Sequence, residues 1–248
     1  MIIISTPIIE VKDVKKVYRI GTNSLNALDG VSFTIDEGEF CCIVGRSGSG
    51  KSTLLNLMAG LEAVTSGQII IAGKHVEKMT ESELILFRQK NIGFVFQSFN
   101  LITSMNALEN TALPLTFRGM NKKTRDKKAM DMLKAVGLGT HWKHKPSQMS
   151  GGQQQRTGLA RALVLDPKIV FADEPTGNLD SKTSEEVMDL ITGLMRQRNQ
   201  TFIMVSHDPS MAAYADKVIH MLDGKVVDMT FNEHENRSNP SEPESVNQ

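Results

Sequence analysis

The sequence predicts an α/β fold with a mainly parallel sheet. Short apolar runs alternate along the chain with longer segments of helical periodicity, which is the pattern typical of this fold class. The clearest strand candidates are residues 39–44, 168–172 and 201–205, and each is almost continuously apolar. Strands of this kind are covered on both faces, as in a parallel sheet flanked by helices.

The clearest helix candidate follows Asp180. Between residues 187 and 195, apolar side chains recur at the spacing of a single helical face. We expect Thr183 and Glu186 to form a capping box near the start of this helix.

Other segments predict two further lobes. The first ~35 residues and residues 67–73 have the pattern of a smaller antiparallel β lobe, and residues 87–150 are richer in helical patterning, for example around Ala129 and Leu133. Near the end, Asp223-Gly224 separates two apolar runs and predicts a hairpin. We therefore expect one domain over residues 8–231, with its helical lobe at approximately 87–150. Residues 232–248 have almost nothing apolar and predict a disordered tail.

Composition limits the function classes. The 248 residues are 40% hydrophobic, which is enough for a core, and the formal net charge is zero. Because a neutral chain gives no electrostatic indication of nucleic-acid binding, we expect no nucleic-acid partner. No apolar run approaches the ~20 residues that cross a bilayer, and the first residues lack the basic flank of a signal peptide. We expect a cytoplasmic protein, with the adjacent Cys41 and Cys42 as buried thiols.

The strongest chemical motif lies between a predicted strand and a predicted helix. It has the phosphate-loop (Walker A) pattern G-x-x-x-x-G-K-[S/T] and reads Gly45-Arg46-Ser47-Gly48-Ser49-Gly50-Lys51-Ser52. Its glycines let the backbone turn so that successive N–H groups point at phosphate oxygens. Lys51 would place a charge on the terminal phosphates, and Ser52 would offer its hydroxyl to Mg²⁺. The helix after the loop, at about 51–59, would direct its positive end at the phosphates.

A second motif follows the strand candidate at 168–172. In a phosphate-loop protein Asp173 would hold the Mg²⁺ shell, and the adjacent Glu174 is placed to polarise an attacking water as general base. An isolated Asp-Glu pair after a strand is more often structural, and the phosphate loop is what favours the catalytic interpretation. A GTPase is not favoured, because the nearest match to its Asn-Lys-x-Asp guanine reader, at 121–124, lacks the acid. Together the two motifs predict a P-loop NTPase core.

A third motif carries a family resemblance. The stretch Met149-Ser150-Gly151-Gly152-Gln153 resembles the Leu-Ser-Gly-Gly-Gln signature of the ABC ATPase family. Ser150 and the two glycines would offer a hydroxyl and exposed N–H groups at a helix start, which makes a second phosphate-binding edge. Met149 replaces the usual Leu at nearly constant volume and should be tolerated. By this resemblance the chain is identified as a member of the ABC transporter ATP-binding proteins.

Further marks of the family stand in the family's order between residues 18 and 207. Gln97 matches the Q-loop glutamine that senses metal and attacking water, His207 matches the switch histidine, and Tyr18 matches the aromatic residue that stacks on adenine. Residues 177–180, Gly-Asn-Leu-Asp, look like the D-loop, which the family more often opens with Ser-Ala. Taken singly, each of these residues would be assigned to packing or hydrogen bonding.

The resemblance implies an ATPase that binds ATP and Mg²⁺ and closes head to tail as a homodimer. ATP would lie between the phosphate loop of one copy and the signature motif of the other. The catalytic residues it implies are Glu174, His207, Gln97 and Lys51, and the Mg²⁺ ligands are Ser52, Gln97 and Asp173. The nucleotide contacts it implies are Tyr18, Gly45, Arg46, Ser47, Gly48, Ser49, Gly50, Lys51, Ser52, Thr53, Ser150, Gly151, Gly152 and Gln153.

Within the family, the stretches at 93–101, 107–110 and 172–180 look most like the subgroup of lipoprotein release, macrolide and peptide export, and cell division. The subgroup implies a separate integral-membrane permease, driven by an ATPase that lies peripherally on the cytoplasmic face of the membrane. The permease would set the cargo. The alternative is a regulatory ATPase of a cell-division-type complex that transports nothing. A soluble ABC ATPase acting on DNA or ribosomes is disfavoured, because neither a long coiled coil nor a second ATPase half occurs.

The sequence leaves two surface assignments open. An apolar group beside the Q-loop fits either a docking surface for a short permease helix or interior packing of the helical lobe; its members are Phe99, Leu101, Ile102 and Met105. A basic run fits either contact with anionic lipid or a solvated helix face; its members are Lys122, Lys123, Arg125, Lys127 and Lys128.

Overall fold

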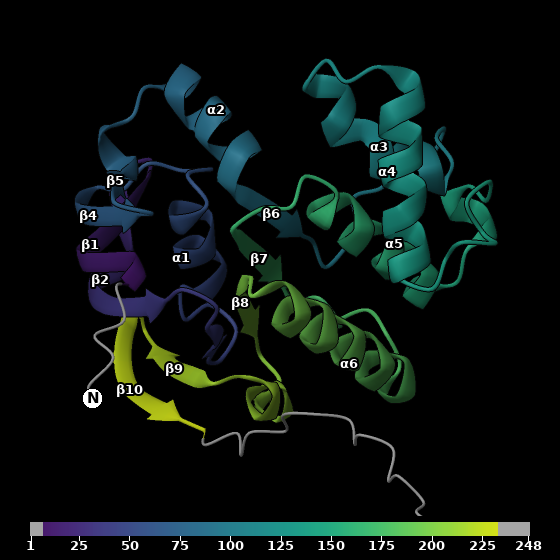
Figure 1. The fold of residues 1–248 in the computed structure, drawn as a ribbon. Helices are drawn as coiled ribbons and strands as arrows, with labels where there is room; N and C mark the ends of the chain where they lie inside the picture. Colours follow the sequence, from purple (N-terminus) through teal and green to yellow (C-terminus); the bar gives the residue numbers. More distant parts are fainter. Residues whose placement is uncertain (1–6, 233–248) are drawn as a thin grey trace, which may run out of the picture.

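The chain forms two β-sheets with helices packed on the larger one (Figure 1). A computed structural model describes residues 7–232. The strands are β1 (Pro7–Ile20), β2 (Asn23–Asp36), β3 (Phe40–Val44), β4 (Ser66–Ile71), β5 (Lys74–His75), β6 (Ile92–Val95), β7 (Ile169–Asp173), β8 (Thr201–Ser206), β9 (Lys217–Leu222) and β10 (Lys225–Phe231). The α-helices are α1 (Lys51–Met58), α2 (Glu81–Asn91), α3 (Ala107–Phe117), α4 (Lys122–Ala135), α5 (Gly151–Leu163) and α6 (Ser181–Arg198). Short 3-10 helices cover Val76–Lys78, Pro146–Gln148 and Pro209–Tyr214.

The larger sheet has the strand order β10-β9-β3-β8-β7-β6, and the smaller sheet has the order β2-β1-β4-β5. In the larger sheet β3 is parallel to both β8 and β9, β8 is parallel to β7, and β7 is parallel to β6. The hairpin strand β10 runs antiparallel to β9. The strands of the smaller sheet all pair antiparallel. The predicted α/β class, with a mainly parallel sheet and an antiparallel β lobe, is therefore confirmed.

Strand β3 separates two hydrophobic cores. Because successive side chains of a strand point to opposite faces, Phe40, Cys42 and Val44 join the core that contains α5 and α6, whereas Cys41 and Ile43 join the core that contains α1 and the smaller sheet. All five are buried. Burial raises the pKa of Cys41 and raises the pKa of Cys42 to about 12, so both side chains are neutral thiols. The strand is covered on both faces, as its apolar run predicts.

The start of α6 differs from the sequence prediction. Asp180 is the N-cap of this helix: the Thr183 backbone N–H donates to Asp180 Oδ1 at 3.0 Å, and the Thr183 hydroxyl donates to Oδ2 at 2.7 Å. Thr183 therefore lies within the first turn, and the predicted capping box of Thr183 with Glu186 is wrong. An aspartate is the stronger cap because its carboxylate also meets the positive helix end. Glu186 instead pairs with Arg156 of α5 at 3.2 Å.

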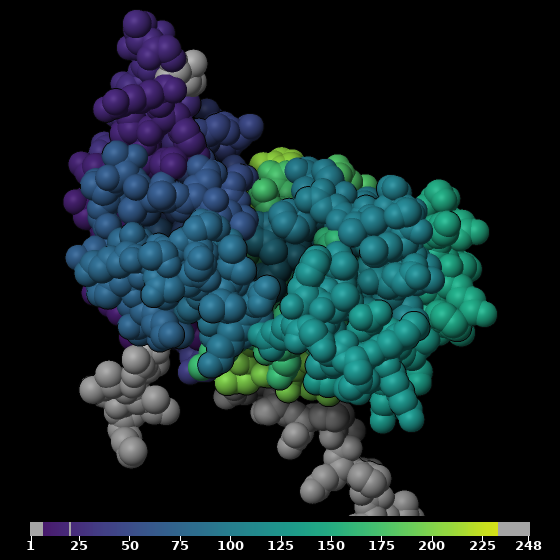
Figure 2. Space-filling model, turned by 90° about the horizontal axis from the view of Figure 1, so that it is seen from above, coloured from purple at the N-terminus to yellow at the C-terminus, as the bar shows by residue number. Residues whose placement is uncertain are grey.

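Helices α3, α4 and α5 lie together on one side of the larger sheet, away from β1, β2 and β4 (Figure 1). The predicted helical pattern is confirmed in α4, where Ala129 and Leu133 are fully buried. In Figure 2 the segment that contains α2 and the segment that contains α3 and α4 form two masses with a hollow between them. The lobe boundary at 87–150 stays a proposal, and residues 233–248 of the predicted tail lie outside the described residues.

None of the helices within residues 7–232 combines the length and the apolar character needed to cross a bilayer.

We expect Phe202→Ala to lower the free energy of unfolding by about 3–5 kcal/mol. Phe202 of β8 is fully buried, and its ring lies edge-on to Phe40 with the centroids 4.8 Å apart. Urea denaturation followed by circular dichroism measures the change. Phe117→Ala is the matched control, because Phe117 is 71% exposed and its loss should change stability by less than about 0.5 kcal/mol. Equal effects of the two substitutions would contradict the assignment of the core.

Candidate functional site

The phosphate loop connects β3 to α1, and neighbouring strands fix its shape. Gly50 is the N-cap of α1 with φ of 95°, and a Cβ at this position would lie 2.5 Å from the carbonyl oxygen of Ala27 in β2. A Cβ at Gly45 would collide with the carbonyl oxygen of Met221 in β9. Both positions require glycine because the backbone of the loop lies directly against two strands. The shape of this loop is thus set by the fold itself.

Lys51 begins α1 and is buried. Its Nζ donates to the carbonyl oxygens of Gly45 at 2.8 Å and of Arg46 at 2.9 Å. Burial lowers the pKa of Lys51, although the carboxylates of Glu174 and Asp173 act in the opposite direction. The ammonium therefore rests on two neutral carbonyls at the positive end of a helix, where an anion is the favoured partner.

Asp173 and Ser52 bring two oxygen donors together at the end of β7. The Ser52 hydroxyl donates to Asp173 Oδ1 at 3.0 Å. Burial raises the pKa of Asp173, and the Ser52 hydrogen bond opposes that shift. Mg²⁺ binds through one or two protein oxygens and completes its shell with water and phosphate oxygens, so this pair fits the ion. Gln97, the third predicted ligand, makes no hydrogen bond to either residue within the described part of the chain.

Three predicted catalytic side chains lie close together, with Glu174 between the other two. Glu174 follows β7 with φ of 44°, in the left-handed region that residues other than glycine adopt only infrequently. His207, which follows β8, places Nδ1 2.9 Å from Glu174 Oε1. A Cβ at Gly177 would lie 2.8 Å from Gln97 Nε2 and 3.3 Å from Glu174 Oε2. The Glu174 carboxylate therefore has the imidazole at its Oε1 and the Gln97 amide on the Gly177 side of its Oε2.

The Q-loop after Gln97 is held from two sides. Phe99 and Asn100 both have positive φ, at 60° and 48°. Arg161 of α5 donates to their carbonyl oxygens, from Nη2 to Phe99 at 2.8 Å and from Nη1 to Asn100 at 2.6 Å. On the other side, the Asn178 amide of the D-loop donates to the Gln97 carbonyl oxygen at 3.0 Å. Sequence reasoning missed Arg161, because a single arginine in a helical segment carries no motif.

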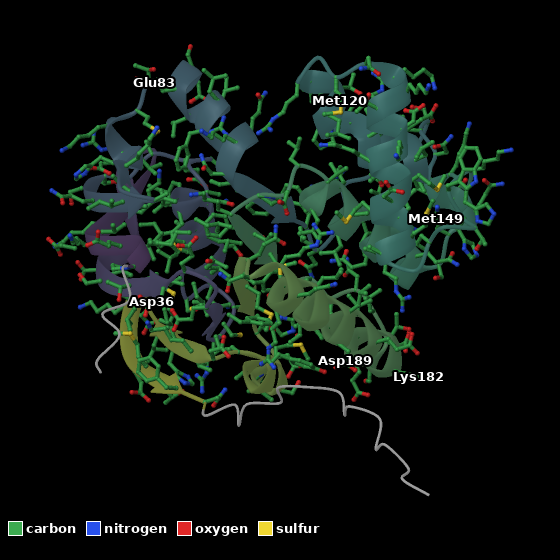
Figure 3. All side chains as sticks on the ribbon, in the orientation of Figure 1. Asp36, Glu83, Met120, Met149, Lys182 and Asp189 are labelled. Carbon is green, nitrogen blue, oxygen red and sulfur yellow. The ribbon has the colours of Figure 1, made fainter. Side chains whose placement is uncertain are left out.

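The signature motif opens α5 and lies against α6. Ser150 is the N-cap: its Oγ accepts from the Gln153 backbone N–H at 3.3 Å, and the Ser150 N–H donates to Gln153 Oε1 at 3.1 Å. A Cβ at Gly152 would lie 2.6 Å from Thr183 Cγ2 of α6. Figure 3 shows Met149, just before α5, and Lys182, in the first turn of α6, on the same side of the molecule. No hydrogen bond or ion pair within residues 7–232 joins residues 150–153 to the phosphate loop.

Tyr18 lies on β1, and its hydroxyl donates to Glu62 Oε2 at 2.6 Å. Burial and the bond to Glu62 raise the pKa of Tyr18, and a hydrogen bond with Thr53 in the first turn of α1 opposes them. Tyr18 is thereby tied to the helix that carries the phosphate loop. Sequence reasoning also missed Glu62, which lies between α1 and β4 and belongs to no motif.

Comparison with known proteins gives the family. A family model described as ABC transporter matches residues 28–177. The macrolide export ATP-binding/permease protein MacB of Chlorobaculum tepidum is 48% identical over 236 residues. This chain belongs to the ABC transporter family. The sequence resemblance to ABC transporter ATP-binding proteins is thereby confirmed.

The match of this ABC transporter chain to MacB covers 95% of the chain but only 36% of MacB, so the chain spans about a third of that relative's length. The ABC transporter ATP-binding protein YtrE of Bacillus subtilis is 46% identical over 220 residues, which cover 87% of this chain and 95% of YtrE. Among solved structures, the dimeric ATP-binding cassette MJ0796, in a post-hydrolysis state bound to ADP and Pi, superposes with a TM-score of 0.84 at 42% identity. That likeness covers 90% of this chain and 98% of the cassette.

We expect Arg161→Met to loosen the Q-loop of this ABC chain. The substitution removes two hydrogen bonds from a guanidinium to backbone carbonyls, and a bond of this kind is worth about 1.5–3 kcal/mol. Amide hydrogen exchange measured by mass spectrometry should speed up about tenfold or more over residues 96–105.

Arg156→Met is the matched control, because Arg156 lies on the same helix but pairs with exposed Glu186 of α6. It should leave exchange in residues 96–105 unchanged. Unaltered exchange there in Arg161→Met would show that the positive-φ turn is held by other contacts.

Proposed function

We propose that this chain binds and hydrolyses ATP to drive an integral-membrane permease, encoded as a separate chain, of the export or force-transmitting type. The observation that carries the proposal is that Glu174, His207 and Gln97 lie together next to Asp173, which Ser52 of the phosphate loop contacts. The relative MacB is named a macrolide export ATP-binding/permease protein, and this name supports the export class. The printed name of YtrE, ABC transporter ATP-binding protein, supports ATP binding.

Binding of the triphosphate follows from the resting contacts of Lys51. Its ammonium exchanges the carbonyl oxygens of Gly45 and Arg46 for oxygens of the terminal phosphates, while N–H groups at the start of α1 hold the others. Ser52 and Asp173 would hold Mg²⁺, which when bound neutralises charge on the phosphates. The phosphate loop and Asp173 lie at the same end of the parallel strands. The γ-phosphate would therefore lie next to Glu174.

Hydrolysis needs one proton to leave the attacking water. Glu174 accepts this proton as general base. Its Oε1 lies 2.9 Å from His207 Nδ1. Its Oε2 lies on the side of Gly177 and the Gln97 amide, where the water would bind. The water oxygen bonds to the γ-phosphorus as the bond to ADP breaks, so the products are ADP and phosphate. Gln97 orients the water, and His207 keeps the carboxylate in place.

The signature motif serves a second copy of the chain. Ser150 is exposed at the start of α5, and no hydrogen bond or ion pair of the described residues ties residues 150–153 to the phosphate loop of the same chain. In a two-fold dimer each copy would place Ser150 and Gly152 against ATP held by the other, which gives two equivalent sites. The dimeric MJ0796 cassette supports this arrangement.

We expect Glu174→Gln to lower ATP turnover by about 10²–10⁴-fold, because the amide cannot accept the proton of the water. ATP binding and ATP-dependent dimerisation should persist, since neither needs that proton transfer. Phosphate release and size-exclusion chromatography with light scattering, in ATP and Mg²⁺, measure the two effects.

Glu186→Gln removes an exposed carboxylate of α6 and should leave turnover unchanged. A Glu174→Gln protein that stayed monomeric in ATP and Mg²⁺ would contradict the sandwich dimer. Wild-type turnover in Glu174→Gln would contradict the role of Glu174 as base.

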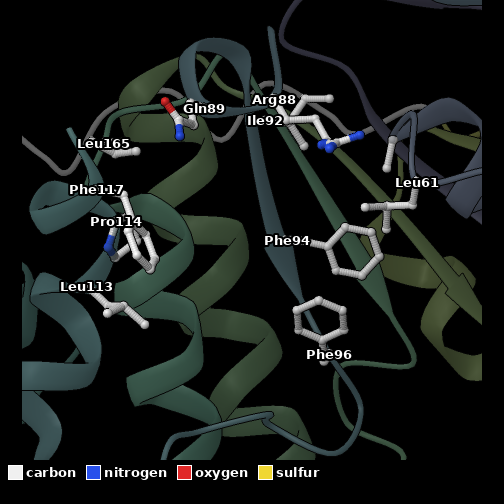
Figure 4. Close-up of a pocket in the computed structure, with 11 residues that line it drawn as sticks. Leu61, Arg88, Gln89, Ile92, Phe94, Phe96, Leu113, Pro114, Phe117 and Leu165 are labelled. Atoms are coloured by element: carbon white, nitrogen blue, oxygen red, sulfur yellow. The ribbon is translucent and has the colours of Figure 1, made fainter. Parts of the chain in front are cut away.

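An apolar groove of about 260 Å³ lies between the core and the helical lobe. Figure 4 shows Phe94 and Phe96 facing Leu113 and Phe117 across it, with Leu61 beside the phenylalanines. Leu61 and Phe117 are 49% and 71% exposed, so the groove opens to solvent. Phe94 and Phe96 belong to the segment that leads into Gln97, so the groove adjoins the start of the Q-loop.

We place the permease contact in this groove. A short amphipathic helix of the partner would insert its apolar side chains there, next to the segment that carries Gln97. The four apolar residues predicted beside the Q-loop do not line this groove: Ile102 is exposed, and Phe99, Leu101 and Met105 are half-buried. Such a contact would place the chain on the cytoplasmic face of the membrane. Of the basic run on α4, Lys122 pairs with Asp126 at 2.6 Å, which supports a solvated helix face.

We expect Phe117→Asp to reduce recovery of the permease about tenfold or more, because docking would bury an unpaired carboxylate. The measurement is affinity purification of the tagged full chain from detergent-solubilised membranes, with the partner identified by mass spectrometry as a multi-span protein. Leu86→Asp is the matched control, since Leu86 is 66% exposed on α2 and does not line the groove. Equal recovery with both variants would place the docking surface elsewhere.

A further inference from the structure

Tyr18 is held by a network that none of the sequence motifs includes. Its hydroxyl donates to Glu62 Oε2 at 2.6 Å, the short distance of a bond to an ionised acceptor. Asn56 Nδ2 donates to Glu62 Oε1 at 3.2 Å, and Lys16 Nζ lies 3.4 Å from Oε2. Burial works to raise the pKa of Glu62, but the bonds from Tyr18 and Asn56 and the charge of Lys16 outweigh it and lower the pKa. The carboxylate is therefore ionised at neutral pH.

Lys16 covers one face of the Tyr18 ring. Both residues lie on β1 two positions apart, so their side chains leave the strand on the same side. Lys16 Nζ lies 4.9 Å from the ring centroid, and it is anchored by donating to the carbonyl oxygen of Ala63 at 2.7 Å. The Lys16 side chain is only 14% exposed, so it is fixed and not a free surface lysine. With an ammonium over one face, an aromatic partner would stack on the face opposite Lys16.

The same network joins the ring to the phosphate loop. Asn56 belongs to α1, the helix that begins at Lys51, and Glu62 follows that helix closely. The hydrogen bonds from Asn56 and Tyr18 to one carboxylate thus link β1 to α1. The position of the ring relative to the phosphate cradle is set by these contacts before a nucleotide binds.

We propose that Glu62 and Lys16 are positioning residues, which hold the Tyr18 ring in place so that its uncovered face stacks on the base of the bound nucleotide. The inference rests on the proposed function, in which ATP occupies the phosphate loop. A tyrosine that is ordered in advance loses no rotamer freedom when the base binds. Without Glu62 the Tyr18 ring has to be ordered when the nucleotide binds. The entropy lost in that step weakens nucleotide affinity by about threefold to tenfold.

The test uses the full chain and Mg²⁺ with the non-hydrolysable analogue AMP-PNP, whose dissociation constant is measured by calorimetry. Glu62→Ala should raise the constant about threefold to tenfold, and turnover at saturating ATP should stay within about twofold of wild type. Tyr18→Phe keeps the ring but loses the bond to Glu62, so it should have the same effect. In a Tyr18→Ala background, Glu62→Ala should have no further effect, because its target is gone.

Glu10→Ala is the matched control, since Glu10 pairs with Lys12 on the same strand at 2.7 Å and should leave affinity unchanged. Weaker binding in Tyr18→Ala with unchanged binding in Glu62→Ala and Tyr18→Phe overturns the inference and leaves the proposed function intact. A full additive effect of Glu62→Ala in the Tyr18→Ala background overturns it as well. Wild-type affinity in Tyr18→Ala removes Tyr18 from the nucleotide site; it overturns the inference and likewise leaves the proposed function intact. If Glu62→Ala does not fold, Tyr18→Phe carries the test.

Discussion

The site depends on the parallel pairing of β3, β8 and β7. Parallel strands lie about 4.8 Å apart and all end at the same edge of the sheet, so the residues that follow them must meet there. At this edge the phosphate loop follows β3, His207 follows β8, and Glu174 follows β7. The two cores that cover the sheet hold the strands in register, which is why groups more than a hundred residues apart form one site. The chemistry is thus a consequence of sheet topology.

The parts of the fold that local pattern encodes were predictable. Strands β3, β7 and β8 agree with the predicted runs to within one residue at each end, because burial on both faces demands a continuous apolar run. The Asp223-Gly224 hairpin lies between β9 and β10, as its turn residues require. The phosphate loop could be recognised for a related reason: nearby backbone requires glycine at Gly45 and Gly50, and both lie in one short stretch.

What sequence reasoning missed depends on contacts between distant segments. Arg161 is specified by two carbonyls of the Q-loop about sixty residues earlier, and Glu62 by a tyrosine on β1. Neither partner is visible in a local pattern. The capping error at α6 has another origin: Thr183 and Glu186 have the right spacing, but Asp180 competes for the same helix end and forms the better cap. Helix α5 connects two parts of the site in this way. Ser150 is the N-cap at its start, and Arg161 near its end donates hydrogen bonds to the Q-loop.

The burial of Cys41 and Cys42 inside β3 has a practical consequence. The sequence has no other cysteine, and both thiols are fully buried and protonated at neutral pH, so neither reacts readily with an alkylating reagent. A cysteine introduced at an exposed position would be the reactive thiol of the protein without removal of any native side chain. Spin labels or fluorophores could therefore be attached at chosen points on the two lobes, and their separation followed through a nucleotide cycle in the otherwise native sequence.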